Sequence, residues 1–103
     1  LYRYRVWTSR VNYTSGSPPE GPTRVAVKIR YKASEAPAVL YPQDDGAMVC
    51  FDEPQRALTP GQAAVFYQGD VLMGGGIIEG DTEHSETLWQ GTPGGPAKEP
   101  IPG

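Results

Sequence analysis

Hydrophobic and polar residues alternate with a period of two along several short segments, and no longer window shows the periodicity of a helix. The clearest of these segments runs from Arg24 to Lys32. One side carries large apolar groups, namely Val25, Val27, Ile29 and Tyr31. The other side carries the small Ala26 and four cations, namely Arg24, Lys28, Arg30 and Lys32. This pattern predicts a strand with an apolar inner face and a cationic outer face.

The same reasoning predicts further strands over residues 2–6, 38–41, 47–51, 63–67 and 71–79. In the first of them, Tyr2, Tyr4 and Val6 share one face, and two arginines share the other. Residues 14–22 are rich in Ser, Gly and Pro and are expected to form a loop.

Turn residues separate the predicted strands. Asp45-Gly46 predicts a type I′ hairpin, in which both central residues need a positive φ. Thr59-Pro60-Gly61-Gln62 predicts a type II turn, because Pro sets φ at the second position and Gly accepts the positive φ at the third. A tight turn is expected at Gln68-Gly69-Asp70. Gly74-Gly75-Gly76 would weaken a strand unless the backbone bends there or another group approaches closely.

About six short strands with frequent turns predict an all-β fold, either a small barrel or a sandwich. We expect residues 1–80 to form this domain. Residues 81–103 contain four Gly, four Pro and four acids, with Leu88, Trp89 and Ile101 as their large apolar groups. Such a segment buries too little to offset its ordering entropy, so a flexible tail is expected, with Leu88-Trp89 as a docking point.

The net charge of −3 hides a strong asymmetry along the chain. Residues 1–32 contain seven bases and one acid, whereas residues 33–103 contain two bases and eleven acids. The overall acidity therefore argues only weakly against a polyanionic partner. No apolar stretch is long enough to predict a membrane span. The chain starts at Leu1 rather than Met, which suggests a piece of a longer protein.

Catalytic and metal-binding patterns are weak. Cys50 is the one cysteine and is expected to be a buried thiol rather than a nucleophile. Glu83, His84 and Glu86 make a poor metal site on the expected tail. The three glycines are not followed by the lysine and helix of a phosphate-binding loop. We therefore predict no catalytic residue, no metal and no cofactor within this chain.

The row of Lys28, Arg30 and Lys32 is the clearest chemical signal. Cations two residues apart along a strand are roughly 6.6–7 Å apart, close to the separation of successive phosphates. Tyr31 could stack on a base or donate a hydrogen bond. The alternative interpretation is an ordinary solvated strand face whose charges discourage edge pairing.

Three segments resemble the last domain of the tRNA-specific 2-thiouridylases: Val27–Tyr31, Phe51–Tyr67 and Gly74–Ile78. The resemblance covers residues 1–80, more weakly before Val25. It implies a small antiparallel β-barrel, similar to the barrels of translation factors. It also implies a parent enzyme with an N-terminal ATP-pyrophosphatase domain and a small central domain. ATP and a persulfide sulfur donor belong to that parent, whose ATP loop and two catalytic cysteines are absent from these residues.

The resemblance implies that Arg30, Tyr31 and Gln62 contact tRNA. Lys28, Lys32 and Arg56 would supply a supporting positive field. The implied partners are tRNA and the parent's catalytic and central domains, in the cytoplasm of a bacterium or in a mitochondrion or plastid. A domain separated from such neighbours should expose an apolar patch, at Trp7 or at the face of Tyr2 and Tyr4. The alternative function is a stand-alone protein-interaction module that does not bind nucleic acid.

Overall fold

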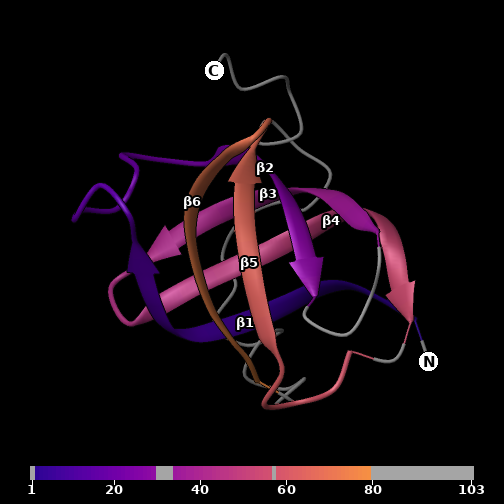
Figure 1. Cartoon of the computed structure of the whole chain (residues 1–103). Coiled ribbons are helices and arrows are strands. Elements are labelled where there is room, and N and C mark those ends of the chain that lie inside the picture. The colour runs from indigo at the N-terminus through magenta and orange to yellow at the C-terminus, as the bar shows by residue number, and fades with distance from the viewer. Residues whose placement is uncertain (1, 30–33, 57, 80–103) are drawn as a thin grey trace.

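The computed structural model describes residues 2–29, 34–56 and 58–79. They form a closed barrel of six antiparallel strands in the order β1-β4-β3-β2-β5-β6 (Figure 1). The strands are β1 (Tyr2–Tyr13), β2 (Thr23–Ile29), β3 (Glu35–Gln43), β4 (Gly46–Arg56), β5 (Ala63–Gln68) and β6 (Val71–Ile78). The predicted all-β barrel is thus confirmed. The described parts of the chain contain no helix long and apolar enough to cross a membrane.

The barrel interior is filled by alternate residues of every strand. In β2, Val25, Val27 and Ile29 are each at most 3% exposed, whereas Lys28 points outward and is exposed. The predicted two-faced pattern of this strand is confirmed as far as Ile29. The rest of the interior is made by Val6, Ala38, Leu40, Ala47, Val49, Phe51, Ala64, Phe66 and Ile78.

A bulge at Arg10 lets the long strand β1 keep its apolar residues inside. Arg10 has a φ of 53°, and the pairing of β1 with β6 shifts register between Ser9 and Asn12. An extra residue in a strand reverses which side chains face the core. Val6 and Thr8 are therefore buried before the bulge, and Val11 packs against the core after it.

The start of β1 extends past the core. Tyr2 and Tyr4 are 65% and 57% exposed, although Val6, predicted on the same face, is 1% exposed. The pairing with β4 jumps from Arg3↔Gln55 to Arg5↔Cys50, so that the end of β4 bends away with the start of β1. The predicted alternation gave no sign of this irregularity.

The β3–β4 hairpin is confirmed, but its predicted turn type is wrong. The two turn residues are Asp44 and Asp45, flanked by the pair Gln43↔Gly46, and neither aspartate has a positive φ. A glycine is needed at position 46 for a different reason, because the neighbouring atoms leave no room for a Cβ. A Cβ there would lie 2.3 Å from the backbone oxygen of Thr8 and 2.7 Å from the Trp7 ring.

The predicted type II turn before β5 is confirmed. Gly61 has a φ of 91°, and the Gln62 N–H donates to the Thr59 oxygen at 3.2 Å. A side chain at Gly61 would therefore be strained even though no atom lies near it.

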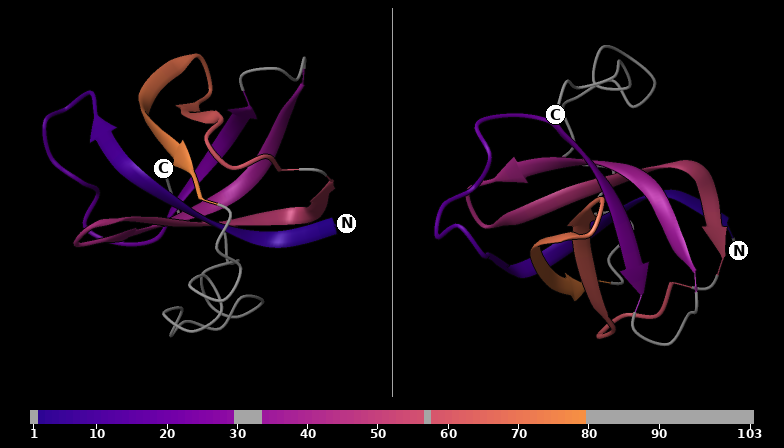
Figure 2. Two further views of the ribbon diagram at one scale, coloured as in Figure 1. Left: turned by 90° about the horizontal axis from the view of Figure 1, so that it is seen from below. Right: turned by 45° about the horizontal axis from the view of Figure 1, so that its top comes forward.

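At the three glycines of β6, neighbouring backbone atoms leave no room for a Cβ. A Cβ on Gly74 would lie 2.2 Å from the Asn12 oxygen, and one on Gly75 would lie 2.8 Å from the Ala64 oxygen. These oxygens belong to β1 and β5, the two strands that β6 joins. Figure 2 shows how strongly β6 curves to complete the barrel. The prediction that these glycines serve a bend and a close approach is confirmed.

We expect Gly74→Ala to lower the free energy of unfolding by about 1–3 kcal/mol, because the methyl group meets backbone atoms that cannot rotate away. Gly21→Ala is the matched control. Its Cβ would meet no atom within 4 Å, so the change should be neutral or stabilising by up to about 1 kcal/mol. Urea unfolding of both variants measures the difference. Equal stabilities would show that β6 does not depend on this close approach.

Candidate nucleic-acid interface

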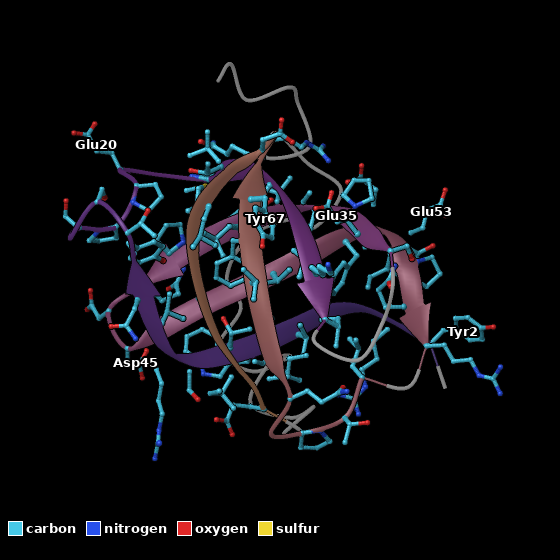
Figure 3. All side chains as sticks on the ribbon, in the orientation of Figure 1. Tyr2, Glu20, Glu35, Asp45, Glu53 and Tyr67 are labelled. Atoms are coloured by element: carbon cyan, nitrogen blue, oxygen red, sulfur yellow. The ribbon has the colours of Figure 1, made fainter. Side chains whose placement is uncertain are left out.

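The barrel has two ends that differ in charge. One, which we call the Tyr2 end, contains the start of β1, the ends of β2 and β4, and the starts of β3 and β5. The other, the turn end, contains loop 14–22 and the turns at residues 44–45 and 69–70. Figure 3 shows Glu20 and Asp45 on the side of the molecule opposite Tyr2.

Three of the six predicted tRNA-contacting residues are described, and all three lie at the Tyr2 end. Lys28 is exposed near the end of β2, Arg56 is exposed at the last position of β4, and Gln62 directly precedes β5. Arg30, Tyr31 and Lys32 lie outside the described residues. The fold therefore gathers at one end residues that are up to 34 positions apart in the sequence, from 28 to 62.

The turn before β5 holds Gln62 in a fixed position. Its side-chain oxygen accepts a hydrogen bond from the Thr59 N–H at 3.1 Å. Its backbone oxygen accepts one from Ile78 at 2.8 Å, and Gly61 donates to the Ile78 oxygen at 2.7 Å. Because the amide oxygen is engaged within the turn, the amide nitrogen is the group that can donate to an external acceptor.

Lys28 has an acidic neighbour. It lies opposite Glu35 in the β2–β3 pairing and opposite Val65 in the β2–β5 pairing. Figure 3 shows Glu35 and Glu53 on the same side of the molecule as Tyr2. The described charges of the Tyr2 end are thus these two glutamates, Glu79 after the end of β6, and four cations, namely Arg3, Arg5, Lys28 and Arg56.

The turn end has the opposite balance. Its loop and turns carry four acids, namely Glu20, Asp44, Asp45 and Asp70, and the nearby bulge carries Arg10. Since potentials depend on the local arrangement of charge, an anionic partner is favoured at the Tyr2 end over the turn end.

Arg24, one of the four cations predicted on the outer face of the strand over residues 24–32, is paired with an acid. Its guanidinium nitrogen Nη1 lies 2.8 and 2.7 Å from the two carboxylate oxygens of Asp52. Both side chains are 31% exposed, so this is a partly screened ion pair. The carboxylate of Asp52 offsets the charge of Arg24. Strand alternation alone could not reveal this partner, because Asp52 is on β4, two strands away from β2.

Cys50 is a buried thiol, as predicted. It is 6% exposed, and burial raises its pKa to about 12 against the weaker, opposing effect of the Arg5 charge. A thiol in this state is a poor nucleophile at neutral pH. No group of three His, Cys, Asp or Glu residues that could hold a metal is found between residues 2 and 79, where the structure describes them. Glu83, His84 and Glu86 lie outside that part of the chain.

Comparison with known proteins places this barrel in a family. A family model described as the aminomethyltransferase beta-barrel domain matches residues 4–78. The tRNA-specific 2-thiouridylase MnmA of Acetivibrio thermocellus is 57% identical over 80 residues, which is 77% of this chain and 22% of that protein. The same-named protein of Desulforudis audaxviator is 62% identical over 61 residues, or 58% of this chain and 18% of that protein. That of Geobacillus thermodenitrificans is 43% identical over 90 residues, or 86% and 24%. The chain thus spans about a fifth of the length of these relatives.

Because Cys50 is buried, the free energy of unfolding is expected to decrease at alkaline pH. The native state keeps the Cys50 proton up to about pH 12, whereas the unfolded chain releases it near pH 9.0. The stabilisation that the native state gains by keeping this thiol protonated is therefore fully present below pH 9 and is lost as pH rises toward 12. As pH rises from about 9 to 11, we expect the free energy of unfolding to fall less steeply for the Cys50→Ala variant than for the unsubstituted chain. Burial also raises the pKa of Tyr13, which adds a slope common to both proteins. Equal slopes in denaturant titrations across this range would contradict the expectation.

Proposed function

This chain belongs to the aminomethyltransferase β-barrel domain family, and on that premise we propose that it is a tRNA-contacting domain of a 2-thiouridylase. It corresponds to the C-terminal barrel domain of MnmA-like enzymes. In the proposed parent, other domains use ATP and a persulfide donor to thiolate the wobble uridine. The barrel itself carries out no chemistry and helps to position the tRNA.

The observation that carries this proposal is the gathering of Lys28, Arg56 and Gln62 at the Tyr2 end of the barrel. Two are exposed cations and the third is an amide held rigidly by its turn. Cations and fixed hydrogen-bond donors are the groups that contact the phosphates and sugars of nucleic acids. The acids of the loop and turns lie at the opposite end, where they do not oppose binding.

We propose that Arg30, Tyr31 and Lys32 complete this surface. Ile29 pairs with Ala64 in the antiparallel β2–β5 ladder. Arg30, Tyr31 and Lys32 directly follow β2 in the sequence, and they would add two cations and an aromatic ring to the described groups of the Tyr2 end.

A protein-interaction module is the second candidate, and the exposure of Tyr2 and Tyr4 favours it. Exposed tyrosines are common at protein interfaces, and these two lie where β1 begins. The sequence predicts an exposed apolar patch at these residues or at Trp7. The tyrosines fulfil the first alternative, whereas Trp7 is 5% exposed and does not contribute. The two candidates differ in their response to salt, because only phosphate contacts release bound counterions.

We expect the domain to bind tRNA carrying an unmodified wobble uridine weakly, with a Kd on the order of 10⁻⁴ to 10⁻⁵ M at 50 mM salt. At 200 mM salt, two phosphate contacts would weaken binding by roughly tenfold. Lys28→Ala should weaken binding and reduce the salt slope by about one. Arg10→Asn is the matched control, since it removes a cation near the turn end and Asn tolerates the positive φ of that position. Binding that is insensitive to salt, or lost equally in both variants, would reject the proposed surface.

In the full-length parent enzyme, Arg30→Ala should weaken tRNA binding several-fold and lower its salt dependence, while ATP affinity stays unchanged. Filter binding measures the first quantity, and an ATP titration of the same preparation measures the second. Equal loss of both would show that Arg30 supports the enzyme's structure and does not contact tRNA.

A further inference from the structure

A groove lies on the outside of the barrel over β2. Ala26 points outward at its floor, because Val25 and Val27 on either side of it are buried in the interior. Ala26 pairs with Tyr67 of β5 on one side and with Pro37 of β3 on the other (Figure 1). Paired residues of neighbouring strands point to the same face of a sheet, so both side chains stand outward beside the small alanine. We call this space, of about 470 Å³, the Ala26 groove.

The Ala26 groove has the shape of a slot for one flat ring. Neighbouring strands lie about 4.8 Å apart, so the strands that carry Tyr67 and Pro37 are about 10 Å from each other. The rings of these two residues form the walls, and the single methyl group of Ala26 leaves the space between them open. On its other side Tyr67 pairs with the apolar Leu72 of β6. An aromatic wall that faces a proline wall across one strand suits a planar, apolar-faced group.

Gln68 supplies polar groups at the edge of the groove. Its side-chain nitrogen Nε2 donates a hydrogen bond to the Arg24 backbone oxygen at 3.4 Å, which holds the amide beside the groove. The second N–H of this amide and the amide oxygen have no hydrogen-bond partner in the part of the chain that the structure describes. One donor and one acceptor are thus available side by side, and the edges of nucleobases present the complementary pattern.

The charges around the groove are balanced. Arg24 is paired with Asp52, and Lys28, the next outward residue of β2 after Ala26, lies opposite Glu35. The turn that follows β5 adds one acid. Because no excess of positive charge draws a phosphate into the groove, an uncharged ring is the favoured occupant. Phosphates are favoured at the Tyr2 end, toward which β2 runs from the groove.

We propose that the Ala26 groove holds one unpaired base of the bound RNA, stacked between Tyr67 and Pro37, while the cations of the Tyr2 end contact phosphates. This inference rests on the proposed tRNA contact and adds a site for a base to it. Single-stranded nucleic acids are bound in this manner, by bases that stack on aromatic side chains beside a positively charged surface. The site would select unpaired nucleotides, because a paired base cannot leave its stack without cost.

The first experiment asks whether the groove accepts a base without any phosphate. NMR spectra of the chain are recorded during titration with adenosine, and with ribose as the control that lacks a base. We expect millimolar adenosine to shift the Tyr67 ring and Ala26 amide signals, and ribose to leave both unchanged. No shift with adenosine would overturn the proposal. Shifts with a proline-rich peptide but not with adenosine would also overturn it, because the groove would then serve a protein partner.

The second experiment measures tRNA binding by variants at 50 and 200 mM salt, after urea unfolding has established that each is folded. Tyr67→Leu removes the aromatic wall, and Ala26→Ile fills the slot with a residue that strands favour. Each should weaken binding about fivefold or more without changing the salt slope. Tyr67→Phe, which keeps the ring, should weaken it much less than Tyr67→Leu. Val71→Ala, at an exposed valine outside the groove, is the matched control and should bind like the whole chain.

The two experiments separate this site from the proposed function. Salt-dependent tRNA binding that Tyr67→Leu and Ala26→Ile leave unchanged would overturn the base site, and the tRNA contact at the Tyr2 end would stand. Adenosine shifts in a chain that does not bind tRNA would support the base site and reject the proposed function.

Discussion

The structure depends on how closely β6 approaches the strands on either side of it. The barrel closes only where β6 joins β1 to β5, and at Gly74 and Gly75 the neighbouring backbone leaves no room for a Cβ. A closed sheet has no edge to protect, but every strand must then curve and tilt to fit. The bulge at Arg10 serves the same end, since it keeps Val11 inside after β1 turns from one partner to the other. Closure is what fixes the ends of β2, β4 and β5 beside one another, and with them the candidate tRNA-contacting residues.

Much of this fold could be predicted from residue patterns. The alternation of Val25, Val27 and Ile29, the type II turn at Gly61 and the close approach at Gly74 are all found in the structure. The failures share one physical cause, which is that they depend on partners distant in the sequence. Gly46 looked like a turn residue, but it is small because the Trp7 ring lies against it. Likewise, only the fold reveals that Asp52 is the partner of Arg24.

The candidate site was predictable in a different way. Charge spacing alone left a solvated strand face and a phosphate-binding row as alternatives, and the resemblance to 2-thiouridylases supplied the choice between them. The structure adds that Lys28, Arg56 and Gln62 lie at one end and that the loop and turn acids lie at the other. The second buried cluster, made by Trp7, Val39, Tyr41, Met48 and Cys50, gave no signal in the sequence, because its members lie on three different strands.

The most direct test of the central claim maps tRNA binding residue by residue, by amide NMR spectra of the isolated domain during a titration at low salt. The account predicts that the largest shift changes occur at the Tyr2 end, at Lys28, Arg56 and Gln62. The amide of Asp45 at the turn end should stay in place. Changes centred on the turn end, or none at the Tyr2 end while tRNA binds, would contradict the claim that this end of the barrel is the RNA-contacting surface.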